Sequence, residues 1–450
     1  MPQRVPQGGR PGKGSGLNVG RLSSLSRRLS RLINAQGKNA QYEQSQSPAF
    51  VSNAPEELES RVLMSTYYVS TGGSDSNAGS LARPFRTIQR AANLAQPGDT
   101  VLVRAGTYRE TVRPLRSGSG SKPITFAAYN NEKVTVSGAD VVGGWSKYSG
   151  SIYKARQSFD MGWGDNQVFV DGQMMIEARW PNTSLDLSHP TKATADKISA
   201  SSSSGTLYDS ALTQPDGTWN GATMHIVPGQ SWFGQTAKVT SYSRGRLSFT
   251  YKNMSSKETP TGGDPYYLTG KFKALDAPTE WFRDPNGTLY LWDPKSDSPA
   301  NHTVEAKHRD YAFDLRGRSN ITVDGFNIFA ATIVTGSSSG VRLNDLDARY
   351  ITHYVGTTGR DQPTDSGIVL NGSNNSLTNS SIAYSAGNGV FVYGSNTKVA
   401  NNVIRDTDYS AGSANAVRAA GSGHLITGNT IFNTGREGIK FSSSPRTKVT

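Results

Sequence analysis

The C-terminal part of the sequence repeats a short pattern of alternating apolar and polar residues. Four segments carry this pattern and align without gaps: residues 366–371, 388–393, 415–420 and 437–442. A second pattern recurs between them, at residues 377–382, 399–404 and 426–431. Alternation with a period of two is typical of strands that bury one face, and the glycine, serine and asparagine residues between the segments favour tight corners.

The spacing of these segments indicates how the strands are arranged. The first pattern recurs after 22, 27 and again 22 residues, which is too short for a unit that contains a crossover helix. One coil of this length cannot bury its inward side chains alone, so successive coils must stack. The pattern therefore predicts an all-β fold, a right-handed parallel β-helix, with three parallel sheets across residues 300–450.

Stacking in register assigns each side chain to a face, because side chains alternate along a strand and coils lie about 4.8 Å apart. The residues expected in the core are Ile368, Leu370, Val390, Val392, Val417, Ala419, Ile439 and Phe441. One outer column is expected to hold Val369, Phe391, Arg418 and Lys440, and the next Asn371, Tyr393, Ala420 and Ser442. At the bends, Asn401, Asn402 and Asn429 are expected to form a structural ladder that satisfies backbone groups.

The N-terminal part of the folded sequence predicts a helix followed by a strand. Residues 85–95 place apolar side chains on one side of a helix, with Pro84 suited to its first turn and a Pro-Gly pair after its end. The run PFRTIQRAAN, followed by PGDTVLVRAGTY, resembles the N-terminal cap and first coils of pectate-lyase-like β-helix proteins. The resemblance implies that residues 66–140 form a cap helix and the first coils, and that the cap covers their exposed strand edges.

Residues 141–299 lose the repeat, and all seven tryptophans of the chain fall in this range. Asp171-Gly172 predicts a hairpin turn. The segments around it and around residues 280–292 resemble an insertion found in many carbohydrate-active β-helix proteins. We therefore expect an inserted β-rich module packed beside the helix. Its tryptophans are expected either to fill the module's core or to stack on sugar rings.

The two ends of the sequence raise separate expectations. Residues 1–65 are rich in glycine, proline and basic residues, which predicts a disordered tail. Residues 58–65 resemble the bacterial export signature Leu-Glu-x-Arg-x-Leu-Leu-Ser, with Met64 in place of the second leucine, which implies an extracellular or cell-surface location. At the other end, Val449 matches Ile426 and starts another coil, so we expect the chain to continue beyond Thr450.

The composition restricts the class of binding partner and the types of chemistry that we expect. The formal net charge is +12, which mildly favours an anionic partner. No nucleic-acid-binding motif is present, which makes a nucleic acid the weaker candidate for this partner. The resemblance to carbohydrate-active β-helix proteins implies a polysaccharide instead, and we expect a monomer. The sequence has no cysteine, which excludes disulfides and thiolate chemistry. No stretch approaches the ~18 apolar residues of a membrane span.

The outer column carries the candidate chemistry. Arg418 and Lys440 occupy equivalent positions on adjacent coils, so their Cα atoms are expected about 5 Å apart. Repulsion between the two charges is expected to lower the pKa of Lys440 toward that of a general base. Glu437 is the third catalytic candidate. The candidate substrate-binding residues are Arg436, His424, Asn415, Tyr409, Tyr393, Tyr354 and His353.

This column resembles, in type, the active sites of β-helix polysaccharide lyases of the chondroitinase-B and alginate-lyase group. The resemblance implies that Lys440 removes the C5 proton of a uronic acid in a β-elimination while Arg418 neutralises the carboxylate. Tyr354 is a candidate acid. The cofactor is not identified by the sequence, and the resemblance makes calcium a candidate.

Three alternatives remain open. Arg418 and Lys440 are also compatible with a solvated charge pair on the face of a solenoid. A glycoside hydrolase on the same fold needs two carboxylates about 5 to 9 Å apart. The candidates for that pair are Asp361, Asp365, Asp406, Asp408 and Glu437. A non-enzymatic surface adhesin would use the β-helix only to bind glycans.

Overall fold

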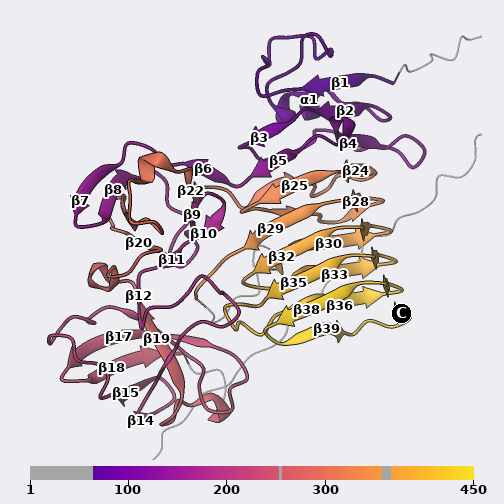
Figure 1. The fold of residues 1–450 in the computed structure, drawn as a ribbon. Helices are drawn as coiled ribbons and strands as arrows, with labels where there is room; N and C mark the ends of the chain where they lie inside the picture. The colour runs from indigo at the N-terminus through magenta and orange to yellow at the C-terminus, as the bar shows by residue number, and fades with distance from the viewer. Residues whose placement is uncertain (1–63, 253–255, 357–365) are drawn as a thin grey trace, which may run out of the picture. The chain divides into compact units, whose positions relative to one another are not determined.

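The computed structural model describes residues 64–252, 256–356 and 366–450. Within these residues, three parallel sheets form the faces of a right-handed β-helix (Figure 1). The first sheet contains β1 (Thr66–Val69), β2 (Thr100–Val103), β4 (Ile124–Ala128), β24 (Ile321–Asp324), β28 (Arg342–Asn344), β31 (Ser376–Thr378), β34 (Lys398–Ala400), β37 (Leu425–Thr427) and β40 (Lys448–Val449). The second contains β3 (Gly106–Tyr108), β5 (Val134–Ser137), β25 (Phe326–Phe329), β29 (Asp347–Thr352), β32 (Ser381–Ser385), β35 (Val403–Thr407) and β38 (Thr430–Thr434). The third contains β23 (Tyr311–Asp314), β26 (Thr332–Val334), β27 (Ser338–Ser339), β30 (Ile368–Ser373), β33 (Val390–Ser395), β36 (Asn415–Ser422) and β39 (Glu437–Ser442).

Successive coils stack in the predicted register. Ile368 pairs with Val390, which pairs with Val417 on the next coil. The expected inward residues up to Ala419 are fully buried and belong to one continuous core. The assignment of Phe441 to the core is wrong, because its side chain is 48% exposed. Phe441 lies on the last described coil that spans all three sheets, so few neighbours cover it.

Asparagine side chains bind neighbouring coils to each other, as predicted. Asn402 donates a hydrogen bond through Nδ2 to Oδ1 of Asn429 at 2.9 Å, and its backbone N–H donates to the same oxygen at 3.0 Å. Asn429 donates in turn to the carbonyl oxygen of Val399 at 2.9 Å. These bonds satisfy buried backbone groups at the bends, which stabilises the stack.

The N-terminal helix α1 spans Ile88–Leu94 and begins later than predicted. Thr87 is the N-cap, and its Oγ1 accepts a hydrogen bond from the backbone N–H of Arg90 at 3.1 Å. Pro84 therefore lies ahead of the helix rather than in its first turn. The apolar residues expected on one side of the helix are buried in the core of the β-helix. A role of α1 as a cap stays a prediction.

A β-rich insertion, which we call the insert, interrupts the β-helix between β5 and β23 (Figure 1). The coils before and after it stack directly, since β4 pairs with β24 and β5 with β25. One sheet of the insert contains β6 (Ala139–Val141), β9 (Val168–Val170), β10 (Gln173–Met174) and β22 (Val304–Lys307). A second contains β7 (Ser146–Ser149), β8 (Ile152–Arg156), β11 (Ile176–Glu177), β20 (Glu280–Arg283) and β21 (Thr288–Trp292). The largest contains β12 (Arg179–Trp180), β13 (Ala193–Thr194), β14 (Lys197–Ala200), β15 (Ser204–Tyr208), β16 (Thr223–Ile226), β17 (Gln235–Ser243), β18 (Arg246–Tyr251) and β19 (Pro265–Thr269).

The predicted hairpin turn is present in the insert. Asp171 and Gly172 both have positive φ, 50° and 81°, and connect β9 to β10. The tryptophans divide into buried and exposed ones, and stacking of the exposed ones on sugar rings stays a prediction. Trp219 and Trp281 are buried in cores of the insert, whereas Trp163 and Trp232 are 61% and 45% exposed.

Several expectations concern residues outside the described ones. The tail and nearly all of the export signature fall in residues 1–63, and the candidate carboxylates Asp361 and Asp365 fall in residues 357–365. Among the residues that are described, no helix is both long and apolar enough to cross a membrane.

Candidate functional site

A cavity of about 430 Å³ lies where the insert meets the β-helix, and we call it the groove. The insert supplies the segment 188–192 and parts of β16 and β19, and the β-helix supplies the turns 407–411 and 433–435. Direct contacts hold the two sides together. The backbone N–H of Gly234 donates to the carbonyl oxygen of Ala411 at 2.7 Å, and Ser188 Oγ donates to Asp406 at 3.3 Å.

Asp408 is the buried acidic group of the groove. It follows β35 in a left-handed conformation with φ of 57°, and only 2% of its surface is exposed. Its carboxylate accepts a hydrogen bond from the backbone N–H of Gly412 at 2.6 Å. Burial outweighs this bond and raises the pKa of Asp408 to about 7. Asp408 is therefore able to hold a proton near neutral pH.

Gly435, on the next coil, allows the close approach that buries Asp408. A Cβ atom at this position would lie 2.4 Å from the carbonyl oxygen of Asp408 and 3.0 Å from its Cβ. Such contacts are too short for any other residue type without a shift of the backbone. The glycine thus lets one coil cover the carboxyl group of the coil before it.

Glu437 supplies a second carboxyl group close to Asp408. It begins β39, and its negative charge is one of the causes that raise the pKa of Asp408. The Glu437 carboxylate contacts two cations, Arg436 at 3.3 Å and Lys440 at 3.5 Å. The turn and the adjacent strand thus bring together one buried acid and one carboxylate with cationic partners.

Glu177 adds a third acidic group, in a smaller cavity of about 100 Å³. Tyr267, Pro190, Tyr409 and Ser410 line both this cavity and the groove. Burial raises the pKa of Glu177 to about 7. The two cavities therefore hold two carboxyl groups, Asp408 and Glu177, that keep a proton more readily than exposed carboxylates do.

A stack of rings and one guanidinium forms the insert's wall of both cavities. The guanidinium carbon of Arg179 lies 3.8 Å from the ring centre of Tyr267. Tyr267 stacks on His225 with ring centres 4.3 Å apart and nearly parallel planes. Burial lowers the pKa of His225 to about 3, so this imidazole is neutral near pH 7. Arg179 and His225 thus cover the two faces of the Tyr267 ring, which lines both cavities.

The predicted column of Arg418 and Lys440 exists, but its surroundings differ from the prediction. The two residues pair across β36 and β39, and the guanidinium carbon of Arg418 lies 5.4 Å from the ring centre of Phe391. The Lys440 ammonium contacts Glu437, so it is not an isolated neighbour of Arg418. Neither Arg418 nor Lys440 is among the described residues that line the groove.

Three predicted substrate-binding residues lie together at the smaller cavity, namely His353, Tyr354 and Tyr409. The hydroxyl group of Tyr409 lies 2.8 Å from Nδ1 of His353 and 3.3 Å from the carbonyl oxygen of Thr352. Burial raises the pKa of Tyr409 well above its usual value. Tyr354 is 4% exposed, and its hydroxyl group lies close to Gly412, which binds Asp408.

The other four candidates lie elsewhere. His424 and Asn415 are each 1% exposed, which contradicts their assignment to a substrate surface. The backbone N–H of Thr397 donates to His424 Nδ1, and Asn415 donates to Asn388, so both side chains connect coils. Tyr393 is 52% exposed, but it lines neither the groove nor the smaller cavity.

Arg436 serves as a link between the insert and the β-helix. Its guanidinium group donates to the carbonyl oxygen of Trp232 and to Ser413 Oγ, both at 2.9 Å. The guanidinium N–H groups of Arg436, which were expected to bind a substrate, therefore bind protein atoms instead. Among the acidic candidates, Asp406 accepts hydrogen bonds from Ser188 and Asn433 at 3.3 and 3.2 Å, which gives it a similar linking role.

Sequence reasoning missed Glu177, Arg179, His225 and Tyr267. They lie in the insert, where the repeat that assigned faces to residues is lost. One available signal was the charge and aromatic content of IEARW, which follows the hairpin turn, and of DPYYLT, at residues 264–269.

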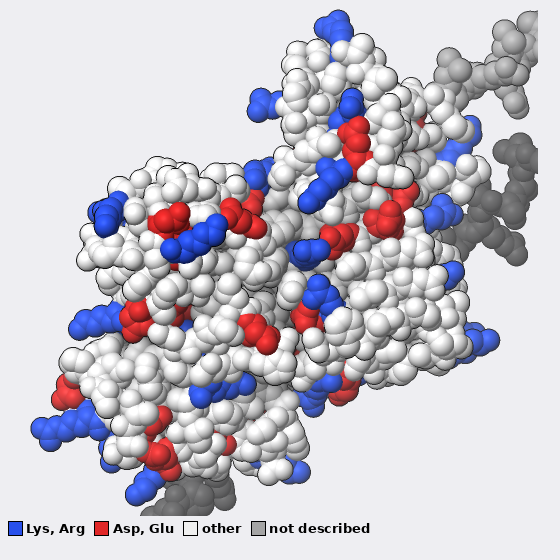
Figure 2. All heavy atoms as spheres, in the orientation of Figure 1, with Lys and Arg blue, Asp and Glu red and all other residues white. Residues whose placement is uncertain are grey.

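The surface charge does not gather into a patch of one sign on the face drawn in Figure 2. Basic and acidic side chains alternate there over both the insert and the β-helix, and uncharged residues cover much of the helix face. The net charge of the chain is therefore not concentrated on this face.

Comparisons with known proteins agree with the fold. Residues 67–174 match the family described as "Pel9A-like, right handed beta helix region", and residues 366–450 match that described as "Right handed beta helix region". A segment of 74 residues is 50% identical to Uncharacterized protein YwoF of Bacillus subtilis, and covers 16% of this chain and 16% of that protein. A segment of 84 residues is 38% identical to Pectate lyase PEL9 of Emericella nidulans, and covers 18% of this chain and 20% of that enzyme.

The matched segments thus span at most a fifth of the curated relatives' own length. A solved structure named "Glycoside hydrolase" is similar to this chain with a TM-score of 0.48 and 13% identity, over 85% of this chain and 97% of that one. The predicted fold class, a right-handed parallel β-helix, is confirmed, and the resemblance to pectate-lyase-like proteins is supported at the level of the β-helix regions.

Proposed function

We propose that this chain is a carbohydrate-active enzyme that cleaves a polysaccharide in the groove by glycoside hydrolysis. The observation that carries the proposal is the buried carboxyl group of Asp408 at the wall of the groove. A pKa of about 7 provides an acid that is protonated when a substrate arrives and ionised after it has given up its proton.

In this reaction, Asp408 donates its proton to the glycosidic oxygen as the bond from that oxygen to the anomeric carbon breaks. Glu437 does not line the groove, but it begins the strand after the Gly435 turn and acts electrostatically on Asp408, and we assign it as the second carboxyl group that the reaction requires. It acts on the anomeric carbon, either directly or by removing a proton from the attacking water. Arg436 and Lys440 contact Glu437 and orient its carboxyl group for this role.

Aromatic side chains in the wall of the groove favour a sugar as the substrate. Tyr267 lines the groove together with Asp408, and aromatic side chains commonly contact sugar rings. The match of residues 67–174 to a Pel9A-like β-helix region and the similarity of one segment to a pectate lyase also favour a glycan.

Substitution of the two carboxyl groups tests the proposal. We expect Asp408→Asn and Glu437→Gln each to lower kcat by roughly 10²–10⁴, which is the usual size of acid–base contributions. Asp347→Asn is the matched control, because Asp347 lies on β29, pairs with Arg349 and lines neither cavity. The assay measures reducing ends released from a panel of neutral and uronic-acid polysaccharides. Full activity of Asp408→Asn would refute the proposal.

A lyase reaction is the second candidate, because Arg418 and Lys440 are in register on adjacent strands. In that case, Lys440 removes the C5 proton and Arg418 neutralises the uronate carboxylate. The reaction would release unsaturated products that absorb ultraviolet light, and Lys440→Ala would abolish them. A hydrolase releases no such products and tolerates Lys440→Ala far better than Asp408→Asn.

Other expectations remain proposals. Export to the extracellular space or the cell surface through the N-terminal tail, a monomeric state and calcium as a cofactor follow from the sequence resemblance and composition alone. Fractionation of cells that express the chain with and without residues 1–60 tests the first of these.

A further inference from the structure

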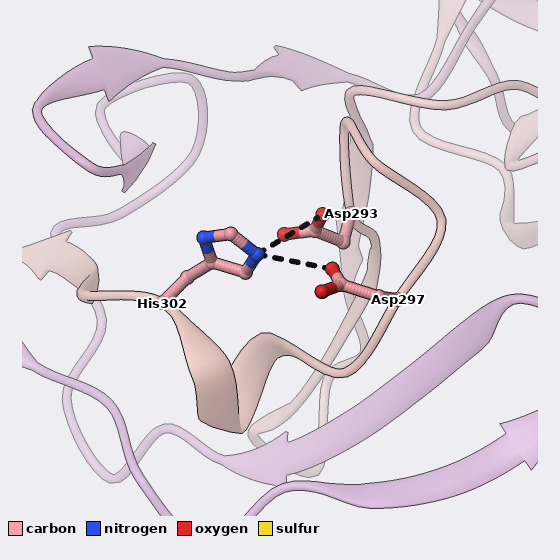
Figure 3. A group of neighbouring side chains, drawn as sticks. All are labelled: Asp293, Asp297 and His302. Atoms are coloured by element: carbon pink, nitrogen blue, oxygen red, sulfur yellow. Dashed lines mark hydrogen bonds and ion pairs between the residues drawn. The ribbon is translucent and has the colours of Figure 1, made fainter.

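Two aspartates and one histidine meet in a short loop of the insert, between β21 and β22. Asp293, Asp297 and His302 each offer one donor atom, and these atoms lie within 4.8 Å of one another. Figure 3 shows Nε2 of His302 directed at both carboxyl groups. The three residues are separate from the groove, because none of them lines it.

The orientation of His302 is fixed by a fourth residue. Its Nδ1 atom lies 2.7 Å from Oδ2 of Asp171, in the hairpin turn between β9 and β10. The other oxygen of Asp171 accepts the backbone N–H of Thr303 at 3.0 Å, which holds the carboxylate in place. Because Asp171 carries no proton to donate, Nδ1 must be the donor. A carboxylate that binds Nδ1–H in this way is the usual support of a histidine that ligates a metal through Nε2.

The donor atoms of the three side chains face one another. Nε2 of His302 lies 3.0 Å from Oδ1 of Asp297 and 3.8 Å from Oδ1 of Asp293. Asp293 is fully buried, and its Oδ2 accepts no hydrogen bond from any described residue. A buried carboxylate oxygen without a partner is costly, and a bound cation would satisfy it.

Of the three carboxyl groups around His302, only that of Asp293 is buried, whereas the side chain of Asp171 is 53% exposed. An ion bound here would lie between the buried Asp293 and the open side of the cluster. The side chain of Asp297 is 45% exposed, which leaves a route for an ion and room for water ligands.

We propose that Asp293, Asp297 and His302 bind one divalent first-row transition metal ion, with Asp171 as a positioning residue. One imidazole and two carboxylates are ligands that suit Mn²⁺ and Zn²⁺, whereas Ca²⁺ prefers sites made only of oxygen atoms. The ion would join the loop that leads back to the β-helix with the hairpin turn at Asp171. It would therefore stabilise the insert.

The experiment uses the full chain, stripped with EDTA, and measures binding of Mn²⁺ and Zn²⁺ by calorimetry, with Ca²⁺ as the comparison ion. We expect one Mn²⁺ or Zn²⁺ ion per chain and a higher Tm in its presence. Free ion at 100 times its Kd should raise the ratio of folded to unfolded protein about 100-fold.

Variants locate the bound ion. His302→Gln and Asp293→Asn should abolish binding, and Asp171→Asn should weaken it by roughly 10–100-fold. Because a change at the buried Asp293 risks misfolding, Asp297→Asn, at the most exposed of the three ligands, is tested as well, with circular dichroism of each variant. The matched control is His189→Gln, since His189 and Asp186 form an exposed pair 3.0 Å apart without a buried carboxyl group.

Three results would overturn the proposal. The first is binding that survives His302→Gln or Asp297→Asn in folded protein, which would mean an adventitious ion. The second is binding of Ca²⁺ in preference to Mn²⁺ and Zn²⁺. The third is no binding of any of these ions, together with an NMR spectrum in which His302 is doubly protonated near neutral pH. Protons would then occupy the place assigned to the metal.

Discussion

Replacement of Asp408 by asparagine tests whether its carboxyl group is as strongly perturbed as its burial indicates. Asparagine has the shape of a protonated aspartate, and its Oδ1 atom can still accept the hydrogen bond from Gly412. The substitution therefore removes the titration while it keeps most of the packing. Any change that depends on pH reports on the lost carboxyl group.

The size and sign of the effect follow from the two pKa values of Asp408. The pKa is 3.8 without the protein environment and about 7 in the folded protein, so the folded state binds the proton more tightly. The stability that this site contributes is fully present below pH ~4 and is lost as pH rises through about 7. The total loss is roughly 4 kcal/mol, from about 1.4 kcal/mol for each pH unit between the two values.

Urea denaturation of wild type and Asp408→Asn across a series of pH values measures this loss. We expect the free energy of unfolding of the variant, minus that of wild type, to increase between pH ~4 and ~7 and to level off above. Because Glu177 and Glu280 also have pKa values raised to about 7 and are present in both proteins, their contributions cancel in the difference. A difference that is constant with pH, or that decreases, would refute the assignment of a buried proton to Asp408.

Three further substitutions test the packing of the coils, each by urea denaturation. Ile368→Ala should lower the free energy of unfolding by about 2–5 kcal/mol, since Ile368 is fully buried between coils. Asn402→Ala should cost about 1–3 kcal/mol, because it removes the side chain that binds the backbone N–H of Ser380 and the carbonyl oxygen of Leu377. Gly394→Ala should cost more than the ~1–3 kcal/mol of an unfavourable φ alone. The φ of Gly394 is 118°, and the new Cβ would lie 2.0 Å from the carbonyl oxygen of Gly372.

The repeat predicted the β-helix because the determinants of that fold are local. A strand alternates its side chains between two faces, and parallel coils stack residue on equivalent residue. Val390 and Val417 could therefore be assigned to the core from their positions in the repeat. The same rule failed for Phe441, because burial on a solenoid also depends on the next coil, which the alternation of one strand does not describe.

The start of α1 shows a second limit. The fixed backbone angle of Pro84 suits the first turn of a helix, but it suits many loop positions equally well. Thr87 begins the helix instead because its side chain accepts the N–H of Arg90, and Glu110 accepts those of Ile88 and Gln89. The carboxylate of Glu110 comes from a different part of the chain, so a pattern within the helix does not contain it.

The site was predicted in part, for a similar reason. Glu437 and Asp408 lie on turns and strands of the repeat, and both were among the carboxylates considered for a hydrolase. Lys440 and Arg418 were predicted as catalytic residues because they lie on strands, where the repeat determines which residues are neighbours. The chemistry of Asp408 depends on what covers it, and burial by Gly435 and by the insert is a property of the assembled chain.

The insert thus determines what the carboxyl group of Asp408 can do. On an uncovered turn, an aspartate is solvated and ionised at neutral pH, and it has no proton to give to a glycosidic oxygen. Here, Gly234 binds the turn at Ala411, and Arg436 binds the carbonyl oxygen of Trp232, so the insert is held over the place where Asp408 lies. Burial raises the pKa of Asp408. Under the proposed function, the β-helix places the carboxyl groups of Asp408 and Glu437 on neighbouring coils, and burial suits Asp408 to the role of the acid.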